Sequence, residues 1–248
     1  MKISVITATY NSASTIADTL ASIADQTYKN VEHIIVDGNS TDETLGIVNT
    51  FHHVTTVISE KDDGIYDAMN KGLVVATGEV IGILNSDDVY AHNGVLETVN
   101  KIFEEQNIDV CYADLEYVDQ RNLNKVVRKW RSGKFNSRSF YWGWMPPHPT
   151  VFVRKKVYQQ VGNFNTSLKS AADYELMLRI FVKNKFNIKY LPEFIVKMRV
   201  GGKSNASLKH RLLANREDKL AWQLNNLSPW FFTVFLKPIR KVPQFLIK

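Results

Sequence analysis

Two adjacent carboxylates, Asp87 and Asp88, follow residues 80–84, a short apolar run with the composition of a buried strand. Two such carboxylates at the rim of a strand repel each other, and a divalent cation that prefers oxygen ligands, Mn²⁺ or Mg²⁺, would offset the repulsion. Such a cation takes few protein ligands and completes its shell with phosphate oxygens. The other explanation is a turn in which Asp87 caps the next helix, and the spacing alone leaves both open.

Polar side chains also stand at the ends of three earlier apolar runs, each with the length of a strand. The runs at 2–8, 31–37 and 54–59 lead into residues 7–11, 37–42 and 60–64, all rich in carboxylates or small polar groups. Ligands of an open parallel sheet bind outside the carboxyl ends of its strands. We therefore expect four strand ends to bring these polar groups to one edge of a sheet.

Strand and helix patterns alternate through the first half of the chain. Apolar residues recur at helical spacing over 14–25 and 65–75, and Ser40 and Thr41 offer an N-cap for a helix that begins with acidic residues. Strands that alternate with helices are typical of crossover units in a mostly parallel sheet. The pattern therefore predicts an α/β fold.

The second half is less regular, and its strands read as a more antiparallel section. The predicted strands are 110–118, 125–131, 150–153, 188–191 and 194–199, and the predicted helices are 95–103, 155–161, 171–181 and 208–224. We expect one domain over residues 1–203 and a C-terminal helical appendage over residues 204–248.

Composition narrows the class of protein. The chain has 248 residues, 44% hydrophobic and 23% charged, which suits one large α/β domain with or without an appendage. The single Cys111 excludes an internal disulfide framework and favours a reducing compartment, and no spacing suits zinc. The first apolar run is too short for a signal peptide, and no stretch approaches the ~20 apolar residues that span a bilayer. We therefore expect a cytoplasmic protein.

Positive charge gathers at the C-terminus. Lys237, Arg240, Lys241 and Lys248 stand among aromatics in residues 229–248 without an acidic residue, and they supply +4 of the net charge of +6. A nucleic-acid binder would carry a basic stripe on the domain itself, so we expect no nucleic-acid partner. Aromatic and cationic residues together favour an anionic lipid surface, here the inner face of the cytoplasmic membrane. A tail packed on the domain or in a dimer interface is the other explanation.

Four stretches, in order and spacing, resemble the family 2 glycosyltransferases with the GT-A fold. They are VITATYN at 5–11, IVDGNSTD at 35–42, DGIYDAMNKG at 63–72 and LNSDD at 84–88. The resemblance covers roughly residues 1–200 and implies a Rossmann-like nucleotide-binding fold, with a donor-binding half over 1–115 and an acceptor-binding half over 116–203. The third stretch is most similar to enzymes that assemble bacterial O-antigens, as in lipopolysaccharide, and capsular or exopolysaccharides.

The resemblance implies a UDP-sugar donor site at the predicted sheet edge. Its expected donor-binding residues are Thr7, Thr9, Tyr10, Asp37, Asp62, Asp63, Lys71, Asn85 and Asp87. Within this set Thr7 and Tyr10 would line the uracil and ribose pocket, Asp37 would accept the uracil N–H, and Lys71 would approach the diphosphate. Asp88 would bind Mn²⁺ or Mg²⁺ directly, with Asp87 as its neighbour, and the metal would offset charge on the leaving nucleoside diphosphate.

The resemblance also implies a general base at the start of a helix. Asp173 stands at the matching position, with Ala172 where the family often has Glu. An inverting transferase needs such a carboxylate to take the proton of the acceptor hydroxyl. The other explanation for Asp173 is a helix N-terminal charge that stabilises by a few tenths to ~1 kcal/mol. Glu175 is a weaker alternative base.

Acceptor-binding residues are expected in the aromatic, proline-rich segment 141–149 and near the base. They are Trp142, Trp144, His148 and Glu175. Either tryptophan would stack on a sugar face or pack inside the fold, and His148 would contact the acceptor or phosphate or serve as a structural hydrogen-bonding group. Arg199 and Lys203 fall where the family has a loop that closes over the diphosphate.

Taken together, the residues predict a metal-dependent inverting hexosyltransferase. It would move a hexose from a UDP-sugar to a polyprenyl-diphosphate-linked saccharide and form a β-linkage. The alternatives are a nucleotidyltransferase and a non-catalytic protein that binds sugar nucleotides or glycans. The chain has no Walker-type phosphate loop or GxGxxG motif, and Asp88 and Asp173 are both present, so neither alternative is favoured.

Overall fold

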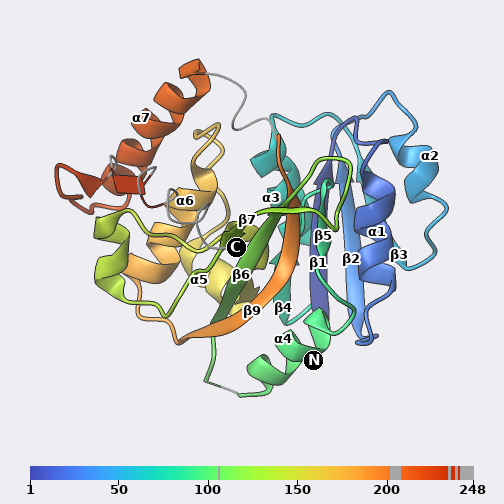
Figure 1. The fold of residues 1–248 in the computed structure, drawn as a ribbon, viewed down its shortest axis with the longest axis horizontal. Coiled ribbons are helices and arrows are strands. Elements are labelled where there is room, and N and C mark those ends of the chain that lie inside the picture. Colours follow the sequence, from blue (N-terminus) through green and yellow to red (C-terminus); the bar gives the residue numbers. More distant parts are fainter. Residues whose placement is uncertain (106, 202–207, 234–235, 238–239, 241–248) are drawn as a thin grey trace.

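The computed structural model describes residues 1–105, 107–201, 208–233, 236–237 and 240. Within these residues a nine-stranded sheet runs in the order β3-β2-β1-β4-β8-β6-β9-β5, with β7 paired to β6 (Figure 1). Helices cover both faces of the sheet (Figure 1). This confirms the predicted α/β fold class.

The first four strands are parallel, as predicted. They are β1 (Ile3–Thr9), β2 (Val31–Asp37), β3 (Val54–Ser59) and β4 (Val80–Ile83). β1 lies between β2 and β4, so that Thr9 is opposite Asp37 and Ile6 is opposite Ile83. Both faces of β1 are buried, which explains its continuous apolar run. The polar segments after these strands therefore start from one edge of the sheet.

Helices on both faces hold this parallel part in place. α1 (Ile16–Ala24) and α2 (Thr44–Val48) pack on one face, where Ile16 and Leu20 meet Ile35 and Val48. α3 (Ile65–Val75) packs on the other face through Ala68, Met69 and Leu73, which join Ile6 and Val36 in the core. The apolar positions of α1 and α3 recur at the predicted helical spacing.

The remaining strands make the second half of the sheet mixed. They are β5 (Asp88–Tyr90), β6 (Val110–Val118), β7 (Val126–Trp130), β8 (Phe152–Arg154) and β9 (Ile188–Arg199). β6 and β9 are parallel, whereas β8, β7 and β5 pair antiparallel with their neighbours. The other helical elements are α4 (Val95–Glu104), α5 (Lys155–Val161) and α6 (Ala172–Met177), the 3₁₀ turns η1 (Ser137–Trp142) and η2 (His148–Thr150), and the π-helical turn η3 (Leu178–Lys183).

Two local differences from the predicted elements have clear causes. Residues 188–199 form one strand rather than two, because the sheet passes Pro192 with a register irregularity: Leu191 pairs with Ala113 and Phe194 with Asp114. Proline, which has no N–H to donate, is tolerated at such bulges. The short strand β5 was not predicted, because its sequence begins with an aspartate, which is typical of loops. It forms a strand because it pairs with β9, which is distant in the sequence.

The helix α7 (Leu208–Leu224) belongs to the predicted appendage, and its described side chains pack on the domain. Ala221 and Trp222 are fully buried in the same hydrophobic cluster as Tyr174 and Phe140, and Figure 1 shows α7 beside α6. The boundary at residues 203 and 204 thus separates segments that share one core. No helix within the described ranges has the length and apolar character needed to cross a membrane.

Candidate active site

The loop between β4 and β5 presents the carboxylate pair. Asp88 opens β5 and is fully buried, and its backbone carbonyl accepts a 2.7 Å hydrogen bond from the hydroxyl of Thr19 on α1. Its Oδ2 accepts a 2.9 Å hydrogen bond from the Asn85 side-chain amide. Burial, and then the neighbouring charge of Asp87, raise the pKa of Asp88 well above its usual range.

Three buried oxygen atoms at the ends of β1 and β4 have no hydrogen-bond partner among the described residues. They are Thr9 Oγ1, Asn85 Oδ1 and Asp88 Oδ1. A buried oxygen left unpaired costs about 1–3 kcal/mol, so such atoms need another electropositive partner. Hydroxyl, amide and carboxylate oxygens are the ligands that Mg²⁺ and Mn²⁺ prefer.

These residues therefore fit a divalent cation, provided that substrate oxygens complete its shell. No cluster of three or more His, Cys, Asp or Glu side chains within the described ranges is arranged to hold a metal alone. A site with one or two protein carboxylates plus phosphate oxygens is the usual arrangement for Mg²⁺ in nucleotide-dependent enzymes.

Arg199, at the end of β9, holds the carboxylate loop in place. Its guanidinium donates to the Asp87 carbonyl at 2.7 Å and to the Gln120 carbonyl at 3.2 Å, and it also pairs with the Asp18 carboxylate. Arg199 is only 6% exposed. Burial raises the pKa of Asp87, and the positive charges of Arg199 and His148 oppose that rise. Arg199 therefore lies at the predicted site as a buried anchor, and Lys203 lies outside the described residues.

The segments after β1, β2 and β3 meet beside this loop. The Ser12 hydroxyl lies 2.9 Å from that of Ser86, which joins the segment after β1 to the carboxylate loop. Gly38 is tightly enclosed: a β-carbon there would come within 2.4 Å of Asp62 Oδ2 and 3.4 Å of the Tyr10 ring. The absence of a side chain at Gly38 therefore lets Asp62 and Tyr10 approach this backbone closely.

Asp37 lies at the base of this region. It is fully buried, and its Oδ2 accepts from the Ser40 backbone N–H at 2.9 Å and from the Ser59 hydroxyl at 2.8 Å. Asp62 accepts a 2.9 Å hydrogen bond from the Gly64 N–H, and Asp63 is exposed beside it. Thr9, Tyr10, Asp37, Asp62 and the Asn85–Asp88 loop are thus gathered at one end of the parallel strands.

Thr7 and Lys71, like Asp37, are predicted donor-binding residues whose side chains have partners within the protein. The Thr7 hydroxyl is fully buried 3.1 Å from His33 Nε2 in the interior. Lys71 lies on α3 and forms ion pairs with Glu60 at 2.9 Å and Asp67 at 3.3 Å. Both contacts hold these side chains within the protein, so their roles in donor binding stay predictions.

The Asp173 carboxylate lies in the first turn of α6 and is shared by two partners. Its Oδ1 accepts a 3.1 Å hydrogen bond from the Tyr66 hydroxyl of α3, and its Oδ2 lies 3.5 Å from Nδ1 of His148. The Asp173 side chain is 18% exposed, so an acceptor hydroxyl can reach it. Burial, and then the charge of Asp173, raise the pKa of the Tyr66 phenol, which stays a hydrogen-bond donor.

The His148 ring interacts with Asp173 and also with the carboxylate loop that contains Asp87. Burial lowers the pKa of its imidazole, and the charges of Asp173 and Asp87 both oppose that fall. One ring therefore lies within electrostatic reach of the candidate base and of the candidate metal-binding loop. The structure brings His148 and Asp173 together, and the charge of Asp87 acts on the same ring.

Other predicted acceptor-binding residues lie elsewhere. Trp144 is a core residue whose indole N–H donates to the Ser132 carbonyl at 2.7 Å. Glu175 is buried in an ion pair with Arg179 at 2.7 Å and also accepts from Asn225 at 2.9 Å. Trp142 is half exposed and contacts Trp230 and Phe232 of the C-terminal segment. The structure does not bring these three side chains to Asp173.

Tyr66 is a site residue that the sequence reasoning did not single out. It stands within the DGIYDAMNKG stretch at 63–72, but no charge or spacing distinguishes it from a core aromatic. Only the packing of α3 against α6 shows that its hydroxyl reaches Asp173.

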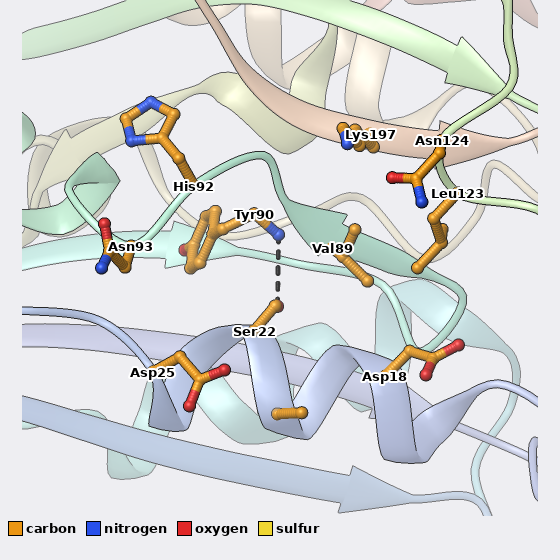
Figure 2. Close-up of a pocket in the computed structure, with 11 residues that line it drawn as sticks. Asp18, Ser22, Asp25, Val89, Tyr90, His92, Asn93, Leu123, Asn124 and Lys197 are labelled. Atoms are coloured by element: carbon orange, nitrogen blue, oxygen red, sulfur yellow. Dashed lines mark hydrogen bonds between the residues drawn. The ribbon is translucent and has the colours of Figure 1, made fainter.

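A separate polar pocket lies on the other side of Asp88's strand. Figure 2 shows its walls, with Asp18 and Ser22 on α1, Asp25 just after that helix, Val89 and Tyr90 on β5, and Lys197 on β9. Its volume is about 570 Å³, and it includes neither Asp87 nor Asp88 nor Asp173. Asp18, the partner of Arg199, forms part of its wall, so this pocket is adjacent to the anchor of the site but distinct from it.

Comparison with known proteins agrees with this geometry. The model of the family described as Glycosyl transferase family 2 matches residues 4–162. A PGL/p-HBAD biosynthesis glycosyltransferase of Mycobacterium bovis is 31% identical over 208 residues, which cover 82% of this chain and 78% of the relative. The chain therefore belongs to glycosyltransferase family 2, and it is a glycosyltransferase.

Solved structures show the same fold. A fragment of S. aureus TarS in complex with UDP-GlcNAc superposes with a TM-score of 0.71 at 24% identity, over 91% of this chain and 65% of that one. The chain spans 43% of a longer TarS structure. A mannosyltransferase of Pyrobaculum calidifontis in complex with GDP-Man and Mn²⁺ superposes with a TM-score of 0.66 at 19% identity, over 99% of this chain and 69% of that one. These likenesses confirm the GT-A fold.

Proposed function

We propose that the protein is a metal-dependent inverting hexosyltransferase that uses a UDP-sugar. Its acceptor is a polyprenyl-diphosphate-linked saccharide, and the product carries a β-linkage, as in the synthesis of O-antigen-like surface polysaccharides. The observation that carries the proposal is the placement of one accessible carboxylate, Asp173, against His148, whose ring also feels the charge of Asp87. This contact supports a base and a leaving-group site that lie near the same histidine.

The proposed donor site is the gathering of strand ends described above. Tyr10 and Asp62 form a wall around Gly38, and the buried Asp37 below it is an acceptor suited to the uracil N–H. Two structural neighbours support a nucleotide-sugar donor, because one is in complex with UDP-GlcNAc and the other with GDP-Man. The choice of uridine rests on the sequence resemblance at 5–11 and 35–42.

The proposed chemistry is a single displacement. The oxygen of the acceptor hydroxyl bonds to the anomeric carbon of the donor sugar, and Asp173 accepts the proton of that hydroxyl. The bond between the anomeric carbon and the UDP oxygen breaks, and its electron pair stays on UDP. Tyr66 and His148 orient the Asp173 carboxylate for this transfer. A divalent cation held by Asp88, with Asp87 and Asn85 beside it, would stabilise the charge on departing UDP.

The proposed acceptor places the enzyme on the inner face of the cytoplasmic membrane. Trp142, Trp230, Phe231 and Phe232 line an apolar groove of about 390 Å³, and Phe231 is 90% exposed. We define these four residues as the aromatic patch. Arg240 is exposed, and Lys241 and Lys248 of the basic tail lie outside the described residues. Aromatic side chains with nearby cations favour an anionic lipid surface, which supports peripheral membrane binding.

A donor screen tests the proposal directly. The purified chain is incubated with Mn²⁺, a polyprenyl-diphosphate-GlcNAc acceptor and, in turn, UDP-Glc, UDP-Gal, UDP-GlcNAc or UDP-GalNAc. We expect UDP release and a glycosylated lipid with one donor, and a β-configured product by NMR. An α-configured product would contradict inversion. Parallel reactions contain GDP- or dTDP-sugars, and turnover with these but with none of the four UDP-sugars would contradict the uridine donor.

A further inference from the structure

Glu217 of α7 binds the chain segment that leads into α6. Its Oε2 accepts hydrogen bonds from the backbone N–H groups of Ser170 at 2.7 Å and Ala171 at 3.1 Å, and its Oε1 accepts from Lys169 at 3.1 Å. Glu217 is only 8% exposed. One buried carboxylate thus holds three consecutive amides immediately before the helix that carries Asp173.

These contacts fix the chain just before α6, a helix that has no side-chain cap of its own. The first N–H groups of a helix have no partner within the helix, and a Ser, Thr, Asp or Asn side chain at the N-cap usually supplies one. The N-cap of α6 is Ala171, whose methyl group cannot accept a hydrogen bond. Glu217 instead holds the three amides that precede the helix, from a distant part of the chain and through charge-assisted bonds that are stronger than neutral ones.

α7 and Asn225, the residue after its end, bind the residues that follow Asp173. The Trp222 indole N–H donates to the Tyr174 hydroxyl at 2.9 Å, and the Asn225 side-chain amide donates to Glu175 Oε1 at 2.9 Å. Residues before Asp173 in the sequence (169–171) and after it (174 and 175) therefore all bind side chains of this C-terminal segment. Its own carboxylate points to partners on other elements, Tyr66 of α3 and His148 of η2.

We propose that Glu217 is a positioning residue for the catalytic base, acting through the backbone of residues 169–171. This inference rests on the proposed role of Asp173 as that base. The charge of Glu217 reaches the same site, since it is one of the negative charges that raise the pKa of the Tyr66 phenol. Loss of the Glu217 carboxylate would free the start of α6 and move Asp173 relative to the donor.

The test separates catalysis from donor binding. We would compare Glu217→Ala, Glu217→Gln and, as a matched control, Asp218→Asn, which removes the adjacent carboxylate on the same helix that pairs with Lys237 at 2.8 Å. The readouts are kcat and donor KM with the most active of the four UDP-hexoses, UDP affinity with Mn²⁺ by calorimetry, and hydrogen exchange of residues 169–178.

We expect Glu217→Ala to lower kcat by about 10- to 100-fold, because a misplacement of about 1 Å can cost that much. Donor KM and UDP affinity should change by less than about twofold, because the hydrogen bonds of Glu217 within the described residues go to residues 169–171, outside the donor half. Exchange over 169–178 should rise. Glu217→Gln should recover most of kcat, since its amide oxygen still accepts from backbone N–H groups, and Asp218→Asn should keep kcat.

Asp173→Asn, measured in parallel, separates the two ways of failing. If Asp173→Asn keeps its turnover, the base assignment is wrong and the positioning role falls with it. If Asp173→Asn is inactive while folded Glu217→Ala keeps wild-type kcat, or if Asp218→Asn loses as much as Glu217→Ala, only the role of Glu217 is refuted. Should Glu217→Ala not fold, Glu217→Asp decides, because its carboxylate is one methylene short of the three amides: it must show raised exchange over 169–178 and a lowered kcat, and unchanged values of both would overturn the proposal.

Discussion

Nδ1 of His148 lies 3.5 Å from Oδ2 of Asp173, and the same imidazole feels the charge of Asp87. The ring therefore joins the acceptor half of the fold to the loop that ends the parallel strands. Because burial lowers the pKa of His148, the imidazole is neutral at neutral pH and can exchange hydrogen bonds without adding a fixed positive charge.

Asp173→Asn should lower kcat by about 10²- to 10⁴-fold, the usual contribution of a general base, while the fold and UDP binding are kept. The amide is nearly the same shape and still accepts the hydrogen bond from Tyr66. Single-turnover transfer assays and UDP calorimetry would measure the two effects. Asp119→Asn, an exposed hairpin carboxylate paired with Lys125, is the control and should keep full activity.

Asp88→Asn should weaken the binding of UDP in the presence of Mn²⁺ by at least about tenfold, since it removes the buried charge that would face the cation. Excess EDTA should have a similar effect on the wild-type protein and little further effect on the variant. Calorimetric titration of UDP with and without Mn²⁺ checks both. The exposed Asp25→Asn variant should bind as the wild type does, and equal binding by Asp88→Asn would refute the metal assignment.

Stability should fall on mild acidification because of His33. Burial, and then the charge of His53, lower the pKa of His33 to about 3, far below the usual value near 6.5 in the unfolded chain. Between these values the unfolded state binds one more proton than the native state, so unfolding becomes easier as the pH falls. For one histidine the loss between pH 7 and pH 5 is about 2 kcal/mol.

His33→Gln should therefore be less sensitive to pH over this range, although it is less stable at pH 7 through its lost contact with Thr7. Urea unfolding at pH 7 and pH 5 would measure the difference for both proteins. An equal loss of stability in the two proteins would show that His33 does not titrate in this way.

Phe231→Ser should lower binding to vesicles that contain anionic lipid by about tenfold, because burial of a phenylalanine side chain in an apolar phase is worth about 1.5–3 kcal/mol. Sedimentation with phosphatidylglycerol vesicles at low and high salt would measure it. Leu220→Ser is the control: Leu220 is 41% exposed on α7 but lies outside the aromatic patch. Equal losses for the two variants, or none for either, would argue against the patch as a membrane contact.

Much of the fold was predictable because its signal is local. The strands β1 to β4 are short segments rich in Val and Ile, and α1 and α3 carry apolar residues at helical spacing, so both patterns can be read without knowing what they pack against. The gathering of Asp37, Asp62 and Asp88 at one edge follows from parallel strands alone.

The rest depends on contacts between residues distant in the sequence. Trp144 and Trp142 look alike in one aromatic segment, yet one is a core residue bonded to Ser132 and the other joins the C-terminal segment. Glu175 and Asp173 stand two positions apart on α6, but only Asp173 faces His148 while Glu175 pairs with Arg179. The partners that distinguish them lie on other elements, so spacing within the segment carries no signal.

The hydrogen bonds between α7 and the region of α6 also limit where this chain could be joined to a relative in a hybrid protein. The family match ends at residue 162, which invites the exchange of everything beyond it to alter the acceptor or the membrane surface. A cut anywhere between α6 and α7 would separate Asp173 from Glu217 and Tyr174 from Trp222. Hybrids should therefore be joined before α6 or after residue 225, so that the two helices are inherited as one unit.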